Sequence, residues 1–414
     1  MEKITEKFFL GRQPILDRNQ EIVGYELLFR AADTTHAVFE SYSHACTSVI
    51  SSALASFGMH EVLGGKLGFI NVPLELLMSE LLEVLPIEQT VLELLETIDL
   101  DEQVIERCRE LRKIGFKLAL DDHEYDDANT DIYYVANIIK IDILMTGMAA
   151  LPEIVRQLRK HPVKILAEKV ETIEQFQICY DLGFEYFQGY FFARPVVLKR
   201  KKIDVSGLAL LKLLQQLSMD ASVQQLEMTF KENPGLSYNL LRLVNSVALG
   251  MREKIKTLRH AIVLLGVNHL RRWIQLSLFS GHDTRSTNHP LLEMAAVRGR
   301  LMEIMFRQLS RRTVDDERAE AAFMVGILSL LDVLFETPME EIIANLNLNE
   351  DVSAALLRRE GRLGAMLTLA EKLELTDFDS VEALLPQCGV SMDQLLTAQL
   401  EAFNWRTSVI HQEG

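Results

Sequence analysis

Polar or acidic side chains close most of the short apolar runs in the first half of the sequence. They are Glu26, Asn71, Glu93, Asp121 with Asp122, Lys140, Glu168 and Gln188. Carboxylate and amide oxygens are hard ligands that suit Mg²⁺ or Mn²⁺ and not Zn²⁺ or copper. If these side chains converge, five carboxylates share one pocket and repel each other unless cations join them.

Each of these residues also has a simpler interpretation. A single carboxylate at a strand end is commonly a helix cap or a solvated loop residue, but a whole series of them after buried strands is harder to explain in that way. Lys140 lies between Ile139 and Ile141, so its stem is predicted to be buried. By itself it could form a structural ion pair, whereas beside carboxylates and metals it could hold a water molecule or a phosphate oxygen.

The elements that must position these residues are buried strands separated by amphipathic helices. Runs rich in Val, Ile, Leu and Phe indicate strands over 8–16, 22–30, 67–72, 90–96, 116–121, 137–142, 163–168 and 185–190. A helix is predicted to end at Gly115, and another begins with a capping box of Thr172 and Gln175 and ends at Gly183.

The connections decide the topology. Only residues 17–20 separate the first two strands, too few for a helical crossover, so these strands form an antiparallel hairpin. The rest repeats strand and helix, which predicts an α/β TIM-like (β/α) barrel with one antiparallel strand. Strand ends meet at one rim of such a barrel, so the polar residues are expected to gather there.

The chain changes character near residue 200, after which long helical periods predominate. We predict a barrel domain over 1–198, a basic linker over 199–202 and an all-α domain over 203–414. We expect a soluble barrel to remain when 203–414 is deleted.

Composition narrows the class of protein. A net charge of −16 argues against a surface that mainly binds nucleic acid. No apolar run reaches the roughly 18–20 residues of a membrane span, and the first residues lack the apolar core of a secretory signal. The four cysteines, Cys46, Cys108, Cys179 and Cys388, have no metal-ligand spacing and are expected to be reduced core thiols of a cytoplasmic protein.

Seven motifs of the first domain match a known family. They are YELLFR (25–30), FINV (69–72), LELLET (92–97), LALDD (118–122), IKID (139–142), AEKVET (167–172) and QGY (188–190). In this order and spacing, residues 7–198 resemble the EAL domain of cyclic di-GMP phosphodiesterases.

The resemblance implies a role for each matching residue. The metal ligands would be Glu26, Asn71, Glu93 and Asp121, with Asp122 bridging or holding a second ion. The catalytic residues would be Asp122, Lys140, which positions the water, and Glu168, which acts as general base or metal ligand. Among the substrate-binding residues, Arg30 would contact a phosphate and Gln188 would support the site, while Glu96 would steady the loop after Asp122. The implied reaction uses two Mg²⁺ or Mn²⁺ ions and in-line attack by hydroxide on one phosphodiester, giving linear pGpG.

Three departures from the family pattern concern this site. Leu27 follows Glu26 where the family has alanine, and Lys169 replaces a glycine. The loop over 121–127 reads DDHEYDD instead of Asp-Asp-Phe-Gly-Thr-Gly, without the glycines that fold over the metals. His123 is interpreted as filling the position of the phenylalanine. This loop decides between turnover and mere binding.

The second domain resembles the HDOD domain, a relative of HD-type phosphohydrolases without their metal-binding histidines. The matching stretches are NPGLS (233–237), LLRLVNS (240–246), AIVLLG (261–266) and FMVGILS (323–329). No catalytic residue is predicted here, and His282-Asp283 is interpreted as a loop dipeptide. We expect a regulatory domain that binds an unknown protein partner.

Three functions stay open at this point. The first is a metal-dependent hydrolase of cyclic di-GMP, the second is an inactive receptor for it, and the third is a protein-interaction scaffold. The expected partners are cyclic di-GMP and, through the barrel, a second copy of the chain. No membrane or direct nucleic-acid partner is expected.

Overall fold

The computed structural model describes residues 8–31, 62–123, 125, 130–193, 205–244, 257–278, 290–309, 316–335, 337–344, 346 and 348–410. The chain divides into two compact units. The barrel unit comprises Met1–Arg194 and Glu371–Thr407, and the helical unit comprises Pro195–Ala370 and Ser408–Gly414.

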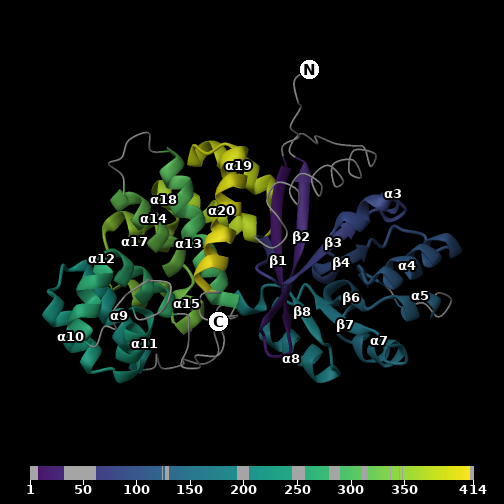
Figure 1. The fold of residues 1–414 in the computed structure, drawn as a ribbon, viewed down its shortest axis with the longest axis horizontal. Helices are drawn as coiled ribbons and strands as arrows, with labels where there is room; N and C mark the ends of the chain where they lie inside the picture. Colours follow the sequence, from purple (N-terminus) through teal and green to yellow (C-terminus); the bar gives the residue numbers. More distant parts are fainter. Residues whose placement is uncertain are drawn as a thin grey trace, which may run out of the picture. The chain divides into compact units, whose positions relative to one another are not determined.

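The barrel unit is built on eight strands that close in sequence order (Figure 1). They are β1 (Phe8–Asp17), β2 (Ile22–Ala31), β3 (Leu67–Val72), β4 (Thr90–Leu94), β5 (Lys117–Leu120), β6 (Ile138–Asp142), β7 (Lys164–Glu168) and β8 (Tyr186–Gln188). β1 runs antiparallel to β2 and β8, and the remaining pairs are parallel. The predicted TIM-like barrel with one antiparallel strand is confirmed.

The antiparallel strand follows from a tight turn between β1 and β2. The Asp17 carboxylate accepts hydrogen bonds from the backbone N–H groups of Asn19 and Glu21, at 2.8 and 2.9 Å. Gln20 adopts a left-handed backbone with φ of 60°. These contacts reverse the chain within four residues, so no crossover helix fits between the two strands.

Short helices follow the parallel strands on the outside of the barrel. They are α3 (Leu74–Leu77), α4 (Glu102–Ile114), α5 (Thr130–Val135), α6 (Ile143–Thr146), α7 (Leu151–Leu158) and α8 (Ile173–Leu182), with 3-10 turns η1 (Glu80–Val84), η2 (Ile87–Gln89) and η4 (Phe191–Ala193). α4 ends at Gly115 with φ of 118°. α8 starts with the capping box of Thr172 and Gln175 and ends at Gly183, as predicted.

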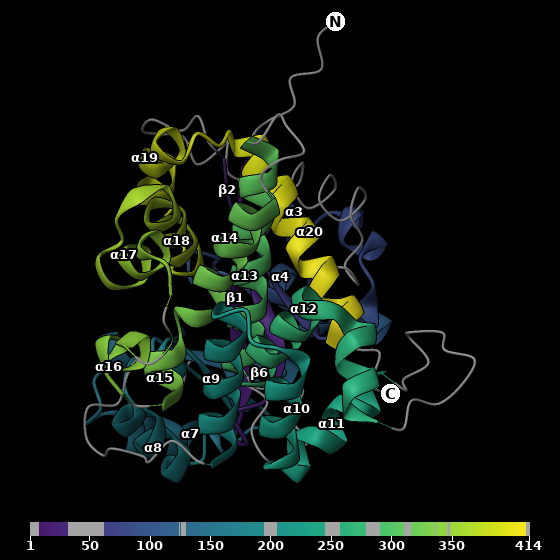
Figure 2. The same cartoon turned by 90° about the vertical axis from the view of Figure 1, so that its left-hand side faces the viewer.

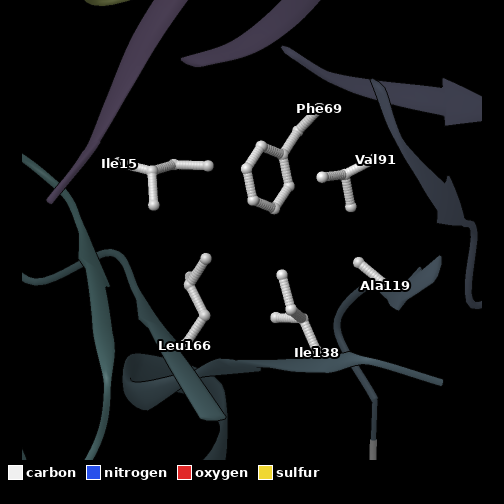
Figure 3. Close-up of a cluster of buried hydrophobic side chains, with 6 residues drawn as sticks. All are labelled: Ile15, Phe69, Val91, Ala119, Ile138 and Leu166. Carbon is white, nitrogen blue, oxygen red and sulfur yellow. The ribbon is translucent and has the colours of Figure 1, made fainter. Parts of the chain in front are cut away.

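An apolar layer fills the lower part of the barrel interior. It consists of Ile15, Phe69, Val91, Ala119, Ile138 and Leu166, which point toward one another (Figure 3). Gly24 of β2 leaves room for this layer, because a Cβ there would lie 2.9 Å from the Phe69 ring. The layer closes the barrel below the rim, so polar groups above it are shielded from water on that side.

The barrel unit also contains residues from the far end of the chain. These are the end of α18 (Gly361–Glu374), α19 (Phe378–Cys388) and nearly all of α20 (Met392–Ile410). Gln399 of α20 donates a hydrogen bond of 2.9 Å to the carbonyl of Leu10, and the Arg12 guanidinium lies 3.9 Å from the centre of the Phe403 ring. In Figure 1, α20 (yellow) lies beside β1 (purple).

The edge of β1 explains this packing. Among the described residues, β1 pairs with β8 only from Ile15 onward, so the preceding residues pair with β2 alone. An open strand edge exposes unpaired backbone groups, and α20 covers it. The sequence places all of 203–414 in the second domain, whereas 371–407 packs with the barrel. The boundaries at 198 and 203, with the linker 199–202, lie outside the described residues and stay a prediction.

The helical unit contains only helices in its described part (Figure 2). They are α9 (Val205–Ser218), α10 (Val223–Lys231), α11 (Pro234–Val244), α12 (Leu258–Ser277), α13 (Pro290–Leu309), α14 (Asp316–Leu328), α15 (Leu331–Phe335), α16 (Met339–Ala344), α17 (Glu350–Arg358) and the start of α18. The predicted break at Gly266 is present, with φ of 74° inside α12. His282-Asp283 lies outside the described residues.

Two further expectations concern the described residues. Cys108, Cys179 and Cys388 are buried cysteine thiols, as predicted, while Cys46 lies outside the described part. None of the described helices is long and apolar enough to cross a membrane.

Candidate active site

A polar layer lies directly above the apolar layer in the barrel. Side chains on one face of a strand repeat every two residues, so the residue two positions beyond Val91 is Glu93, on the same face. On each of the other parallel strands, the residue two positions beyond the apolar layer is also polar. On the antiparallel β1, the corresponding residue lies two positions before Ile15. Each strand thus contributes one polar residue. These are Gln13, Glu26, Asn71, Glu93, Asp121, Lys140, Glu168 and Gln188.

Lys140 lies at the centre of this layer and is completely buried. Its Nζ atom lies 2.6 Å from Asp121, 2.8 Å from Glu93, 2.9 Å from Glu168 and 3.6 Å from Glu26. Burial alone lowers the pKa of a lysine, but these carboxylates outweigh it and raise the pKa of Lys140 well above its ordinary value. Lys140 therefore stays protonated, and its ammonium group holds together the carboxylates contributed by four strands.

One ammonium cannot balance the carboxylates around it. Burial raises the pKa of Glu93 and of Asp121, and Lys140 only partly opposes the shift. Burial likewise raises the pKa of Glu168 to about 8. The layer therefore has excess negative charge, which protons or further cations must neutralise.

Amide side chains fix the orientation of Glu26. Asn71 Nδ2 donates to one carboxylate oxygen of Glu26 at 3.2 Å, and Gln188 Nε2 donates to the other at 2.6 Å. Gln188 Nε2 also lies 2.9 Å from Gln13 Oε1. Gln13 was not among the predicted site residues, although its place two residues before Ile15 on the antiparallel strand marks it as a member of the layer.

Several buried oxygens of the site accept no hydrogen bond from any described residue. They are Asn71 Oδ1, Glu93 Oε2, Asp122 Oδ1, Glu168 Oε2 and Gln188 Oε1. Buried acceptors without a donor are costly and rare, so they indicate the place of an ion or water. Among the described residues, no group of three His, Cys, Asp or Glu side chains forms a finished metal site. The Lys140 ammonium lies between the carboxylates that would form one.

Two left-handed residues shape the side of the rim after β5 and β7. Asp122 has φ of 41° and Lys169 has φ of 56°. The left-handed backbone explains the family's glycine at the position of Lys169. Lys169 Nζ binds the buried Asp142 carboxylate at 2.5 Å. Burial alone would raise the pKa of Asp142, but this hydrogen bond and those from Met145 and Leu144 lower it.

His123 packs as a loop side chain. Its Nε2 atom lies 2.8 Å from the Tyr133 hydroxyl, and Tyr125 stacks on the same ring with centroids 5.4 Å apart. The remainder of the loop, Glu124 and 126–127, lies outside the described residues.

Two predicted site residues lie away from the polar layer. Arg30 is four residues beyond Glu26 on β2, and its Nη2 atom binds the Asp379 carboxylate of α19 at 2.6 Å. Glu96 is exposed after β4 and forms no hydrogen bond or ion pair with a described residue. All the other predicted residues except Asp122 belong to the layer, and Asp122 follows Asp121 directly.

Comparisons with known proteins agree with this architecture. The EAL domain profile matches residues 3–195, and the HDOD domain profile matches residues 208–344. "Uncharacterized protein YuxH" of Bacillus subtilis is 30% identical over 96% of this chain and 98% of its own length. "Cyclic di-GMP phosphodiesterase CdgJ" of Vibrio cholerae is 31% identical over 97% of this chain and 93% of its own length.

Solved EAL structures resemble only part of the chain. A standalone EAL protein of Vibrio cholerae, solved with cyclic di-GMP, has a TM-score of 0.37 and 22% identity over 46% of this chain and 93% of its own. An EAL domain protein of Listeria monocytogenes has a TM-score of 0.36 and 22% identity over 46% of this chain and 89% of its own. From the domain profiles and the two full-length relatives, the chain belongs to the family of EAL-domain proteins that carry an HDOD domain.

Proposed function

We propose that this chain is a metal-dependent phosphodiesterase that hydrolyses cyclic di-GMP to linear pGpG, with the HDOD domain as its regulatory module. The observation that carries the proposal is the polar layer, in which carboxylates from four strands surround Lys140 above a closed apolar floor. The full-length relative named as a cyclic di-GMP phosphodiesterase supports the choice of substrate.

The side chains of the site fit hard divalent cations. Buried oxygens without donors on Asn71, Glu93, Asp122 and Glu168 lie in a layer with excess negative charge, and Mg²⁺ and Mn²⁺ prefer oxygen ligands of this kind. The proposed ligands of two such ions are Glu26, Asn71, Glu93, Asp121 and Asp122. When bound, the ions would neutralise phosphate charge and favour deprotonation of water.

The residues of this chain then divide the work of hydrolysis. Lys140 holds the attacking water beside the carboxylates, and Glu168 accepts its proton as general base. The water oxygen bonds to phosphorus while the bond from phosphorus to the ribose 3′ oxygen breaks, and the 3′ oxygen takes up a proton from solvent, which opens the ring to pGpG. Glu168 needs positive charge beyond Lys140 for this role, since burial, only partly opposed by Lys140, raises its pKa to about 8 and favours the protonated form at neutral pH.

The surrounding residues orient substrate and ligands. Gln188 holds Glu26 through its amide and supports the bound substrate beside it. Arg30 contacts a phosphate, because its planar guanidinium matches phosphate as well as carboxylate. Glu96 steadies the loop that follows Asp122.

We also propose a cytoplasmic location, because buried cysteine thiols suit a reducing compartment. A homodimer through the barrel and a protein partner of the HDOD domain belong to the same proposal.

Turnover tests this proposal directly. The full chain is incubated with cyclic di-GMP and Mg²⁺ or Mn²⁺, and pGpG is followed by chromatography. Glu26→Ala should abolish the product, while Glu88→Ala, a change at an exposed glutamate of the same unit, should retain it. If the chain binds cyclic di-GMP but forms no pGpG with either metal, it is an inactive receptor. If it neither binds cyclic di-GMP nor forms pGpG, it is a protein-interaction scaffold.

A further inference from the structure

The inner face of the β1–β2 hairpin continues above the polar layer. The strand register pairs Gln13 with Glu26 within the layer, and Phe9 with Arg30 four residues farther along. Because strand side chains alternate, both pairs lie on the same face. Anything that lies along this face stands directly over one side of the acidic rim.

Residues 376–379 occupy this face. Thr376 Oγ1 accepts a hydrogen bond of 3.4 Å from Gln13 Nε2, which places it next to the polar layer. Phe378 stacks on Phe9 with ring centroids 5.5 Å apart. Farther out, the Asp379 carboxylate lies 2.6 Å from Arg30. The segment, which we call the strap, therefore follows the hairpin from the rim outward.

The hairpin is shaped to receive the strap. Gly11 lies between the two same-face pairs, and a Cβ there would come within 2.7 Å of Thr376 and 3.0 Å of Phe378. A glycine inside a strand weakens the strand, and it often marks a place where another chain segment approaches closely. The close approach of the strap supplies that reason, so the contact is a built feature of the barrel unit.

The strap is also held in its own shape. Thr376 has a left-handed backbone with φ of 56°. The Asp377 carboxylate binds Lys372 Nζ at 2.8 Å and the Ser380 hydroxyl at 2.7 Å. The strap therefore presents Asp379 to Arg30 at little cost in conformational entropy.

Charge decides what the strap does to the site. The guanidinium of Arg30 binds carboxylate in the geometry that also suits phosphate. The Arg30 side chain is 35% exposed and that of Asp379 is 82% exposed, so the pair is open to exchange with solutes. A carboxylate on Arg30 both occupies its donors and adds negative charge where an anionic dinucleotide would approach.

We propose that the strap is an internal competitor of substrate, in which Asp379 stands in for a phosphate of cyclic di-GMP on Arg30. The proposal rests on the phosphodiesterase function for the identity of the ligand. Binding of the dinucleotide exchanges Asp379 for phosphate and loosens the start of α19. The C-terminal segment thereby sets the affinity of the barrel for its substrate.

Binding measurements test the competition. The dissociation constant of cyclic di-GMP is measured by calorimetry with Mg²⁺ on the full chain carrying Glu168→Gln, so that no product accumulates. Adding Asp379→Asn should tighten binding about two- to fivefold, the effect of one exposed ion pair. Glu382→Gln, an exposed acid on the same helix, should change nothing. At about 1 M NaCl, where the screening length is about 3 Å, the gain should vanish.

A double-mutant cycle and a motion readout complete the test. With Arg30→Ala in place, Asp379→Asn should have no further effect on affinity. Cyclic di-GMP should also speed amide exchange over 376–388 in the chain with native Asp379. The proposal that the strap competes with substrate is wrong if Asp379→Asn leaves the affinity for cyclic di-GMP unchanged or lowers it. It is also wrong if cyclic di-GMP leaves amide exchange over 376–388 unchanged. If Asp379→Asn binds cyclic di-GMP more tightly but the wild-type chain forms no pGpG, the competition by the strap is supported and the phosphodiesterase function is rejected.

Discussion

Lys140 Nζ lies 2.8 Å from Glu93 Oε1, and neither side chain is exposed to solvent. The same ammonium serves the carboxylates of Asp121, Glu168 and Glu26. Lys140→Met should lower the free energy of unfolding of the metal-free protein by about 3–5 kcal/mol, because it leaves buried carboxylates without their cation. Urea denaturation measures the loss. Lys113→Met, at an exposed lysine of α4, is the control, and equal stability of the two variants would contradict a central role for Lys140.

The stability of the metal-free protein should fall as pH rises from about 5 to about 8. Burial raises the pKa of Glu168 from 4.5 to about 8, so in this range the folded protein keeps a proton that the unfolded chain has released. Raising the pH removes that proton and leaves a buried charge, which destabilises the fold. Urea denaturation in EDTA should show this slope, and Glu168→Gln should reduce it.

Divalent cations should reverse this trend. Mg²⁺ or Mn²⁺ binds deprotonated carboxylates, so the stabilisation it confers should grow with pH over the same range. Thermal unfolding with and without metal, at several pH values, measures the gain. A gain that is the same at every pH would show that the ions bind away from the polar layer.

Lys169 tests the backbone strain beside the site. Its φ of 56° suits glycine, and both Lys169→Gly and Lys169→Ala remove the ion pair with Asp142. Lys169→Gly should therefore be more stable than Lys169→Ala by about 1 kcal/mol, because only glycine adopts this conformation freely. At Lys113, inside α4, the order should be the opposite, with alanine the more stable. The same order at both positions would contradict strain at Lys169.

A barrel cut after residue 198 should not behave as the sequence alone predicts. The cut removes 371–407 and leaves Phe9 and the edge of β1 uncovered. An exposed apolar strand edge promotes association, so the fragment should aggregate on light scattering. A chain ending at 407 should remain monodisperse or form only defined oligomers. A soluble, monomeric 1–198 fragment would show that the C-terminal helices are dispensable.

Local pattern was sufficient for most of the fold and the site. Apolar composition predicted all eight strands within a few residues, and the four-residue connection at 17–20 predicted the antiparallel hairpin. The polar residues at the strand ends follow the alternation of side chains, so Glu93, Lys140 and Glu168 had to share one face once the barrel closed. Family motifs added the chemistry of these residues.

The tertiary structure decided what no local pattern contains. In the sequence, Gln13 has no feature that distinguishes it from other strand residues. Its place in the polar layer follows from the antiparallel register of β1 and β2, which pairs Gln13 with Glu26. Arg30 and Asp379 are 349 residues apart, and neither residue has a sequence context that names the other. Helical periodicity predicts that α19 and α20 each have an apolar face. It does not predict which surface that face packs against, because burial of apolar surface is non-directional. Local patterns in the sequence thus predict the barrel and its acidic rim, whereas long-range packing brings the C-terminal helices onto β1 and Asp379 onto Arg30.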